Sequence, residues 1–184
     1  QAMQELLDRP EQTRRMGRQA RDSVADITWD KTVKALLGEE KPWTTVSVPR
    51  RKKVVLASTF QVSPADSGGK LRIDHLCREL ARHAEVTVVC LGPASATGKP
   101  VHLAQGVTEI SIPRSKEHRA LDRELKQRLG ASVQDIAAIH GYDSTIRFVE
   151  ELGCACRDAD LAILAHPFLY HALKQVYAGP FWYD

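Results

Sequence analysis

The fold class follows from residues 54–91, VVLASTFQVSPADSGGKLRIDHLCRELARHAEVTVVCL. This stretch opens with VVLAS, a continuous apolar run that is typical of a strand buried on both faces of a parallel sheet. Leu71, Leu76 and Leu80 then recur near one face of a helix, which predicts a helix over 69–83. EVTVVCL, at the end of the stretch, predicts a second strand. Together these elements make one right-handed β-α-β unit.

The rest of the chain continues this alternation of strands and helices. The predicted strands lie at 107–112, 161–166 and 180–184, and the predicted helices at 115–129, 144–157 and 166–176. Because strands alternate with helices, the chain is expected to be an α/β protein with an open, doubly wound parallel sheet. The main domain is therefore placed at residues 54–184.

Residues 1–37 have a different pattern, with two amphipathic helices and no strand. Pro10 separates the two helices and suits the first turn of the second one. The apolar positions of the second helix and its continuation are Met16, Ala20, Val24, Ile27, Trp29, Val33, Leu36 and Leu37. Residues 38–53 contain two prolines, charged residues and small polar residues, so they are interpreted as a linker.

The composition favours a soluble globular protein. The 184 residues are 43% hydrophobic and 27% charged, and the net charge of +3 is too small to indicate a nucleic-acid partner. The basic run at 50–53 is either the solvated end of the linker or a contact for a phosphate or an anionic membrane surface. Four scattered cysteines, with the last two spaced C-x-C, favour free thiols in a reducing compartment, which suggests the cytoplasm.

The loop Ser67-Gly68-Gly69-Lys70 lies between a predicted buried strand and the start of a helix. Backbone N–H groups and the positive end of the helix dipole make such a position suitable for an anion. Two glycines let a ligand approach the backbone closely and permit a positive φ. An ordinary turn at the start of a helix explains the same residues. Neither the dinucleotide fingerprint G-x-G-x-x-G nor the phosphate loop G-x4-G-K-[ST] is present.

The same residues resemble a known family. Residues 54–92 and 158–184 look like the strand, Gly-Gly loop, helix and later strands that open GT-B glycosyltransferases, of the large retaining group that includes family 4. Residues 1–37 are similar to the C-terminal tail of the same family, at Met16-Gly17, Ala20-Arg21 and Trp29. The resemblance thus implies the tail of one transferase unit followed by the Rossmann-like N-terminal half of a second, as a fragment of a tandem polypeptide.

The resemblance implies transfer of a sugar from a nucleotide-sugar donor to a glycan, lipid or small-molecule acceptor, with no metal and no cofactor. In that family Gly68 and Gly69 would contact the donor diphosphate or the acceptor side of the cleft, and Lys70 and Arg72 would add positive charge or remain solvated. His166, at the carboxyl edge of the sheet, would bond an acceptor sugar or have a structural role.

The resemblance brings no catalytic residue into this span. The donor-binding E-x7-E motif belongs to the other half of the family fold, and the E-x6-E spacing from Glu117 to Glu124 lies on a charged, exposed helix. The fragment alone is therefore expected to be inactive. Two alternatives stay open: a non-catalytic module that binds a nucleotide or a partner, and a GT-B sugar-nucleotide epimerase.

Overall fold

The computed structural model describes residues 10–24, 28–37, 50–131 and 133–183. The chain divides into two compact units, residues 1–44 and residues 45–184. In its described part, the first unit contains the helices α2 (Pro10–Val24) and α3 (Trp29–Leu37) and no strand, as the sequence predicts. The helix expected before Pro10 lies outside the described residues.

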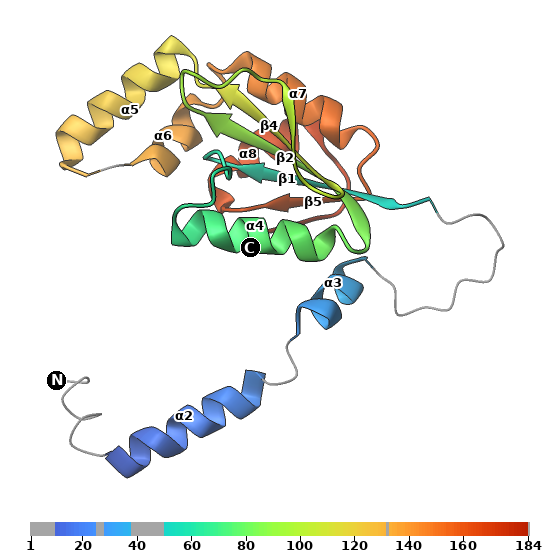
Figure 1. Cartoon of the computed structure of the whole chain (residues 1–184). Helices are drawn as coiled ribbons and strands as arrows, with labels where there is room; N and C mark the ends of the chain where they lie inside the picture. The colour runs from blue at the N-terminus through green and yellow to red at the C-terminus, as the bar shows by residue number, and fades with distance from the viewer. Residues whose placement is uncertain (1–9, 25–27, 38–49, 132, 184) are drawn as a thin grey trace. The chain divides into compact units, whose positions relative to one another are not determined.

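The second unit is built on a six-stranded sheet with the strand order β3-β4-β2-β1-β5-β6 (Figure 1). Its strands are β1 (Lys52–Ser58), β2 (Ala84–Gly92), β3 (Pro100–Ala104), β4 (Val107–Pro113), β5 (Leu161–Leu164) and β6 (Phe181–Tyr183). All neighbouring strands pair in parallel except β3, which runs antiparallel to β4 at the edge. The predicted doubly wound, mostly parallel α/β fold is confirmed, and it is Rossmann-like.

The helices of this unit are α4 (Gly68–Leu80), α5 (Lys116–Leu129), α6 (Gln134–Gly141), α7 (Ile146–Cys156) and α8 (Tyr170–Val176), with a 3₁₀ turn, η1, at Pro167–Leu169. The crossovers β1-α4-β2 and β4-α7-β5 progress in opposite directions along the sheet, so right-handed connections place α4 and α7 on opposite faces. None of the described helices combines the length and apolar character needed to cross a membrane.

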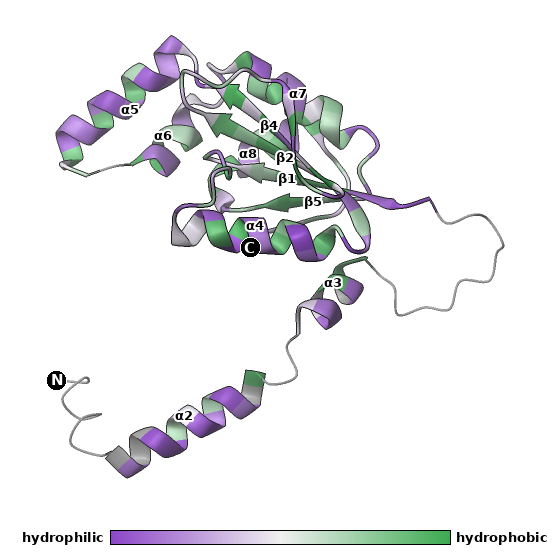
Figure 2. Ribbon diagram, in the orientation of Figure 1, coloured by the Kyte–Doolittle hydropathy of each residue, from purple (hydrophilic) through white to green (hydrophobic). Residues whose placement is uncertain are grey.

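A hydrophobic core lies between the sheet and the helices α7 and α8. Phe148, Leu152 and Leu173 are fully buried there, against inward-facing strand residues such as Val55 and Val89. Figure 2 shows the central strands coloured as apolar, which agrees with the continuous hydrophobic runs read from the sequence.

Two elements of the structure are absent from the sequence prediction, β3 and α6. The edge strand β3 has the sequence PVHLA, and its first three residues are exposed, so it carries neither an apolar run nor a clear alternation. The helix α6 is eight residues long, too short to give a strong helical period. The segments before and after the third predicted strand are therefore more structured than expected.

The basic run at 50–53 is bound to carboxylates of the same chain. Arg50 Nη2 lies 3.0 Å from Asp160 Oδ1, and the Lys53 backbone N–H donates to Asp160 Oδ2 at 2.8 Å. Lys53 Nζ lies 3.7 Å from Asp158 Oδ2. The strand β1 begins at Lys52, two residues inside the predicted linker. The acidic residues Asp158 and Asp160, just before β5, pair with the basic residues at its start. These contacts favour the structural interpretation of the run over a ligand contact.

The connection from β2 to β4 has an unusual form for this sheet. In the part of the chain that the structure describes, residues 93–106 contain the edge strand β3 and no helix. A helix at this point of a doubly wound sheet would cover β4 on the α4 face. Loops at 59–67 and 93–99 approach β4 instead: the Val62 N–H bonds Glu109, and the Gly98 N–H bonds the Ser111 carbonyl.

Candidate functional site

Two adjoining cavities lie at the carboxyl ends of β1, β2 and β4, where ligands bind in open α/β sheets. The larger has a volume of about 550 Å³, and its polar lining includes Lys70, Arg114, Gln134 and Ser95. We call it the arginine cavity. The smaller, of about 220 Å³, has a lining that includes Ser63, Ser95, Thr97, Lys99, Glu109 and Ser111, and we call it the serine cavity. Gln61, Ser63 and Ser95 line both, so the two cavities meet.

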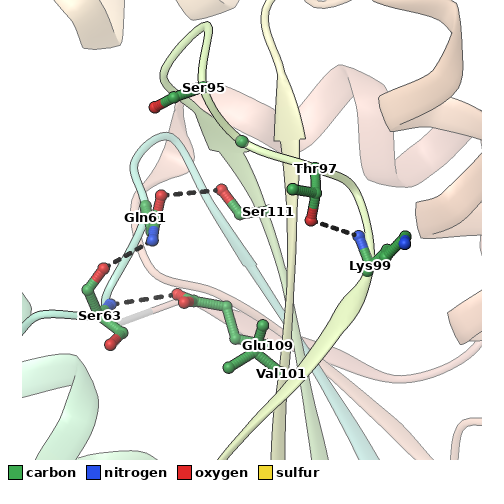
Figure 3. A pocket seen from close by; sticks show the side chains of 9 residues that line it. Gln61, Ser63, Ser95, Thr97, Lys99, Val101, Glu109 and Ser111 are labelled. Atoms are coloured by element: carbon green, nitrogen blue, oxygen red, sulfur yellow. Dashed lines mark hydrogen bonds between the residues drawn. The ribbon is translucent and has the colours of Figure 1, made fainter.

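The loop that follows β1 forms the wall between the two cavities. Gln61 holds it with both ends of its side-chain amide: Nε2 donates to the Ser63 carbonyl at 2.7 Å, and Oε1 accepts from Ser111 Oγ at 3.2 Å (Figure 3). Ser58 Oγ donates to the Phe60 carbonyl at 2.8 Å, at the beginning of the same loop. The Gln61–Ser111 bond ties the loop to β4, and the loop is also held by α6 through Thr59 and Asp135 and by α4 through Asp66 and Lys70.

Glu109 lies beneath this loop, in the middle of β4, and is only 2% exposed. Its Oε1 accepts a hydrogen bond from the Val62 backbone N–H at 2.7 Å. It also accepts one from the Ser63 N–H at 3.3 Å, which Figure 3 shows. Burial raises the pKa of Glu109, and the two backbone bonds and the charge of Lys70 act in the opposite direction. The carboxyl group therefore serves as a fixed acceptor for the loop.

Arg114 follows β4 directly and reaches back over the carboxyl end of β1. One nitrogen, Nη2, donates to the Thr59 carbonyl at 2.9 Å and to Gln134 Oε1 at 3.2 Å. Its Nε is buried without a hydrogen-bond acceptor, and within the described residues Arg114 forms no ion pair. Burial lowers the pKa of Arg114, and the charges of Asp122 and Asp135 oppose that shift. Arg114 is thus a partly buried cation whose protein partners are neutral oxygens.

The structure brings three of the five predicted site residues close to the arginine cavity. Lys70 lines it and forms an ion pair with Asp66 at 2.9 Å, which lowers the pKa of Asp66. Gly69 and His166 both approach Phe60, another lining residue: a Cβ on Gly69 would lie 3.6 Å from Phe60 Cζ, and the His166 ring centroid lies 5.7 Å from that of Phe60.

The other two predicted residues lie farther from the cavities. Gly68 is the first residue of α4 and has open space around it, since a Cβ there would meet nothing within 4 Å. Arg72 is exposed on α4 and lines neither cavity. The first helical bond of α4 runs from the Leu71 N–H to the Ser67 carbonyl at 2.8 Å, so the preceding N–H groups have no acceptor inside the helix.

The positive φ considered for the Gly-Gly loop is wrong. Gly68 and Gly69 already belong to the first turn of α4, and the glycines with positive φ in the described chain are Gly98, Gly106 and Gly130. The conformation is that of an ordinary helix start, which any residue can adopt. The remaining reason for glycine at these two positions is the absence of a side chain, which leaves room for a ligand at the start of α4.

Sequence reasoning missed the polar residues that β4 contributes, Glu109 and Arg114. Glu109 is the one charged residue in the apolar pattern VTEISI, and an ionisable group at a buried strand position calls for partners. Arg114 stands just past the end of a parallel strand, which is where ligand-binding residues of such sheets occur. Both signals are present in the sequence. Glu109 bonds Val62 and Arg114 bonds Thr59, about fifty residues earlier in the chain, so the sequence alone does not show these pairs.

The acidic and histidine side chains of the described residues suggest no metal site. Among the described residues, no three His, Cys, Asp or Glu side chains gather in a way that could hold a metal ion. The pair Glu117 and Glu124 lies on α5, and Glu124 is largely exposed, as expected from the sequence. Comparison of the chain with models of protein families, with curated proteins and with solved structures gave no match.

Proposed function

We propose that the Rossmann-like unit is the N-terminal half of a GT-B glycosyltransferase, and that the intact protein transfers a sugar from a nucleotide-sugar donor to an acceptor. The observation that carries this proposal is the pair of joined cavities at the carboxyl ends of β1, β2 and β4, beside the first turn of α4. The Gly-Gly sequence that prompted the family resemblance stands at that turn, and Lys70 lines the larger cavity.

The described residues support a role for this half in binding the substrates. The catalytic groups would then belong to the rest of the enzyme. Basic side chains and free backbone N–H groups stabilise a leaving diphosphate by charge and hydrogen bonding. Lys70, Arg114 and the first turn of α4 are groups of that kind. Glu109, which lines the serine cavity, is engaged by two backbone N–H groups, which suits it to hold the loop rather than to move protons.

A sugar-transfer assay on the intact protein tests this proposal. The expected result is transfer from one of a panel of labelled nucleotide sugars to an acceptor mixture, and no transfer by residues 1–184 alone. Binding of a nucleotide sugar without transfer by the intact protein would favour the alternative of a non-catalytic module. Interconversion of free sugar nucleotides without an acceptor would favour the epimerase. Transfer by the 184-residue chain alone would contradict the division of roles described here.

A further inference from the structure

The arginine cavity is lined by two cations, Lys70 and Arg114. Lys70 has an ion pair with Asp66, but an ammonium group has three donors and Asp66 occupies one of them. Arg114 forms no ion pair within the described residues, and its Nε and Nη1 make no hydrogen bond there. Asp122 and Asp135 act on Arg114 through their charges but form no ion pair with it, so its unused donors favour an anionic occupant of the cavity.

The serine cavity has a different chemical character, although it adjoins the first. Its lining includes the hydroxyl groups of Ser63, Ser95, Thr97 and Ser111 and the amide of Gln61, beside the charged side chains of Lys99 and Glu109 (Figure 3). Hydroxyl and amide groups both donate and accept hydrogen bonds, which is what the hydroxyls of a sugar or polyol require. One molecule that reaches from the first cavity to the second would therefore combine an oxyanion with several hydroxyl groups.

From this arrangement we infer that the acceptor is a phosphorylated sugar or polyol, whose phosphate lies between Lys70 and Arg114 and whose hydroxyls enter the serine cavity. The planar fork of a guanidinium matches phosphate oxygens, and an ammonium group adds a point charge beside it. The combined volume of the two cavities, about 550 and about 220 Å³, suits a small molecule of this kind. This inference rests on the proposed function, because it names the acceptor of that reaction.

The donor diphosphate is the other source of phosphate in such an enzyme, and the linings favour the acceptor. A nucleotide needs apolar or aromatic surface for its base, whereas Phe60 is the one aromatic side chain in the two linings. Phe60 already packs against His166, with ring centroids 5.7 Å apart. A sugar phosphate needs no such surface.

Titration calorimetry on the full 184-residue chain tests the inference with four probes: glucose 1-phosphate, glucose, inorganic phosphate and uridine diphosphate. Glucose 1-phosphate is expected to bind more tightly than either glucose or inorganic phosphate, and uridine diphosphate no more tightly than inorganic phosphate. Arg114→Gln should weaken glucose 1-phosphate roughly 10- to 100-fold, the usual effect of losing a hydrogen bond to a charged group. Arg128→Gln on α5 is the matched control, because it removes the same charge from an exposed site and should leave binding unchanged.

A second variant keeps the test independent of folding. Lys70→Gln acts on the other side of the cavity, at the first turn of α4, and should weaken the same probe while the thermal midpoint stays close to that of the original chain. The inference is overturned if folded Arg114→Gln and Lys70→Gln bind glucose 1-phosphate as the control does. It is also overturned if uridine diphosphate binds tightest through these residues.

The outcomes also separate this inference from the proposed function. Transfer by the intact protein to an uncharged acceptor, unaffected by Arg114→Gln, would overturn the inference and leave the transferase standing. Binding of glucose 1-phosphate that depends on Arg114, in an intact protein without transferase activity, would support the site and reject the transferase.

Discussion

On one face of the sheet, α7 and α8 pack apolar side chains directly against the strands, and Phe148, Leu152 and Leu173 are fully buried. On the other face, α4 packs against β2, while the loops at 59–67 and 93–99 approach β4 through hydrogen bonds. The difference follows from the β2–β4 connection, in which an edge strand stands where a crossover helix would cover the sheet. Helices make a dry core, whereas loops leave polar cavities. We therefore assign ligand binding to the loop-covered part of the second face, beside α4, whose Ile73, Leu76 and Leu80 are buried.

The largest effect is expected from a truncation on the helix-covered face. Phe148→Ala should lower the free energy of unfolding by about 3–5 kcal/mol, because it removes a fully buried ring and leaves a cavity. Denaturant unfolding of the 184-residue chain measures this change. Met16→Ala in α2, where the side chain is 50% exposed, is the control and should stay within about 0.5 kcal/mol of the original chain. A change below about 1 kcal/mol for Phe148→Ala would contradict the assignment of the core to this face.

The helix α5 buries one histidine in its neutral form. His118 on α5 is 1% exposed, and its Nδ1 lies 3.1 Å from Thr145 Oγ1. Thr145 Oγ1 also accepts from the Ser115 N–H at 3.1 Å, and His118 Nε2 is buried without a hydrogen-bond partner in the described part of the chain. Burial first, and then the charge of Arg114, lower the pKa of His118 to about 4. An unfolded histidine titrates near the ordinary value of 6.5.

The unfolded chain therefore binds more protons than the folded chain between pH 6.5 and about 4, and stability must fall as the pH falls through that window. The loss from His118 alone should approach about 3 kcal/mol. His118→Asn, whose side-chain amide can still form a hydrogen bond with Thr145, should remove this part of the pH dependence. Unfolding curves of both proteins between pH 4 and pH 7 measure it, and parallel pH profiles would contradict the neutral buried histidine.

The loop-covered face buries a carboxyl group, and its pH dependence should have the opposite sign. The pKa of Glu109 is raised, chiefly by burial, so its contribution is complete below the unfolded value of about 4.5. That contribution is lost as the pH rises through the folded pKa. Glu109→Gln keeps an acceptor for the loop and removes the charge, so the variant should gain stability relative to the original chain as the pH rises.

Glu109→Leu is the harsher change at the same position, because the N–H groups of Val62 and Ser63 lose their acceptor. It should cost about 1–3 kcal/mol, the usual effect of leaving a buried donor unsatisfied. Equal stabilities of the Gln and Leu variants would show that the carboxyl group does not hold the loop. Urea unfolding at one neutral pH is sufficient for this comparison.

Most of the fold could be predicted from the sequence because the strands on both sides of the sheet centre are continuous apolar runs. The strand β1 was expected at Val54 and starts at Lys52, since Asp160 pairs with the basic residues before it. The edge strand β3 could not be found, because exposed edge residues carry no apolar period. The cavity lining was found only in part: Lys70 is local to the Gly-Gly motif, whereas Arg114 reaches the site through tertiary contacts with Thr59 and Gln134.

The smallest effects concern two glycines with different backbones. Gly130, at the end of α5, has φ of +69° and open space around it, so Gly130→Ala should cost about 1–2 kcal/mol through the left-handed backbone alone. Gly69 lies in a helical turn with ordinary contact distances, so Gly69→Ala should change stability by less than about 1 kcal/mol. Thermal midpoints of the two variants test this order, and a larger loss for Gly69→Ala would contradict the helical start described here.

A nitrogen–proton correlation spectrum of the labelled 184-residue chain, recorded during a titration with glucose 1-phosphate, locates the ligand on one face of the sheet or the other. The shifts are expected to be saturable and confined to the loops at 59–67 and 93–99, the first turn of α4 and Arg114. The amides of α7 and α8 should stay unchanged. Saturable shifts centred on α7 and α8, or no saturable shift at all, would contradict the assignment of ligand binding to the loop-covered face.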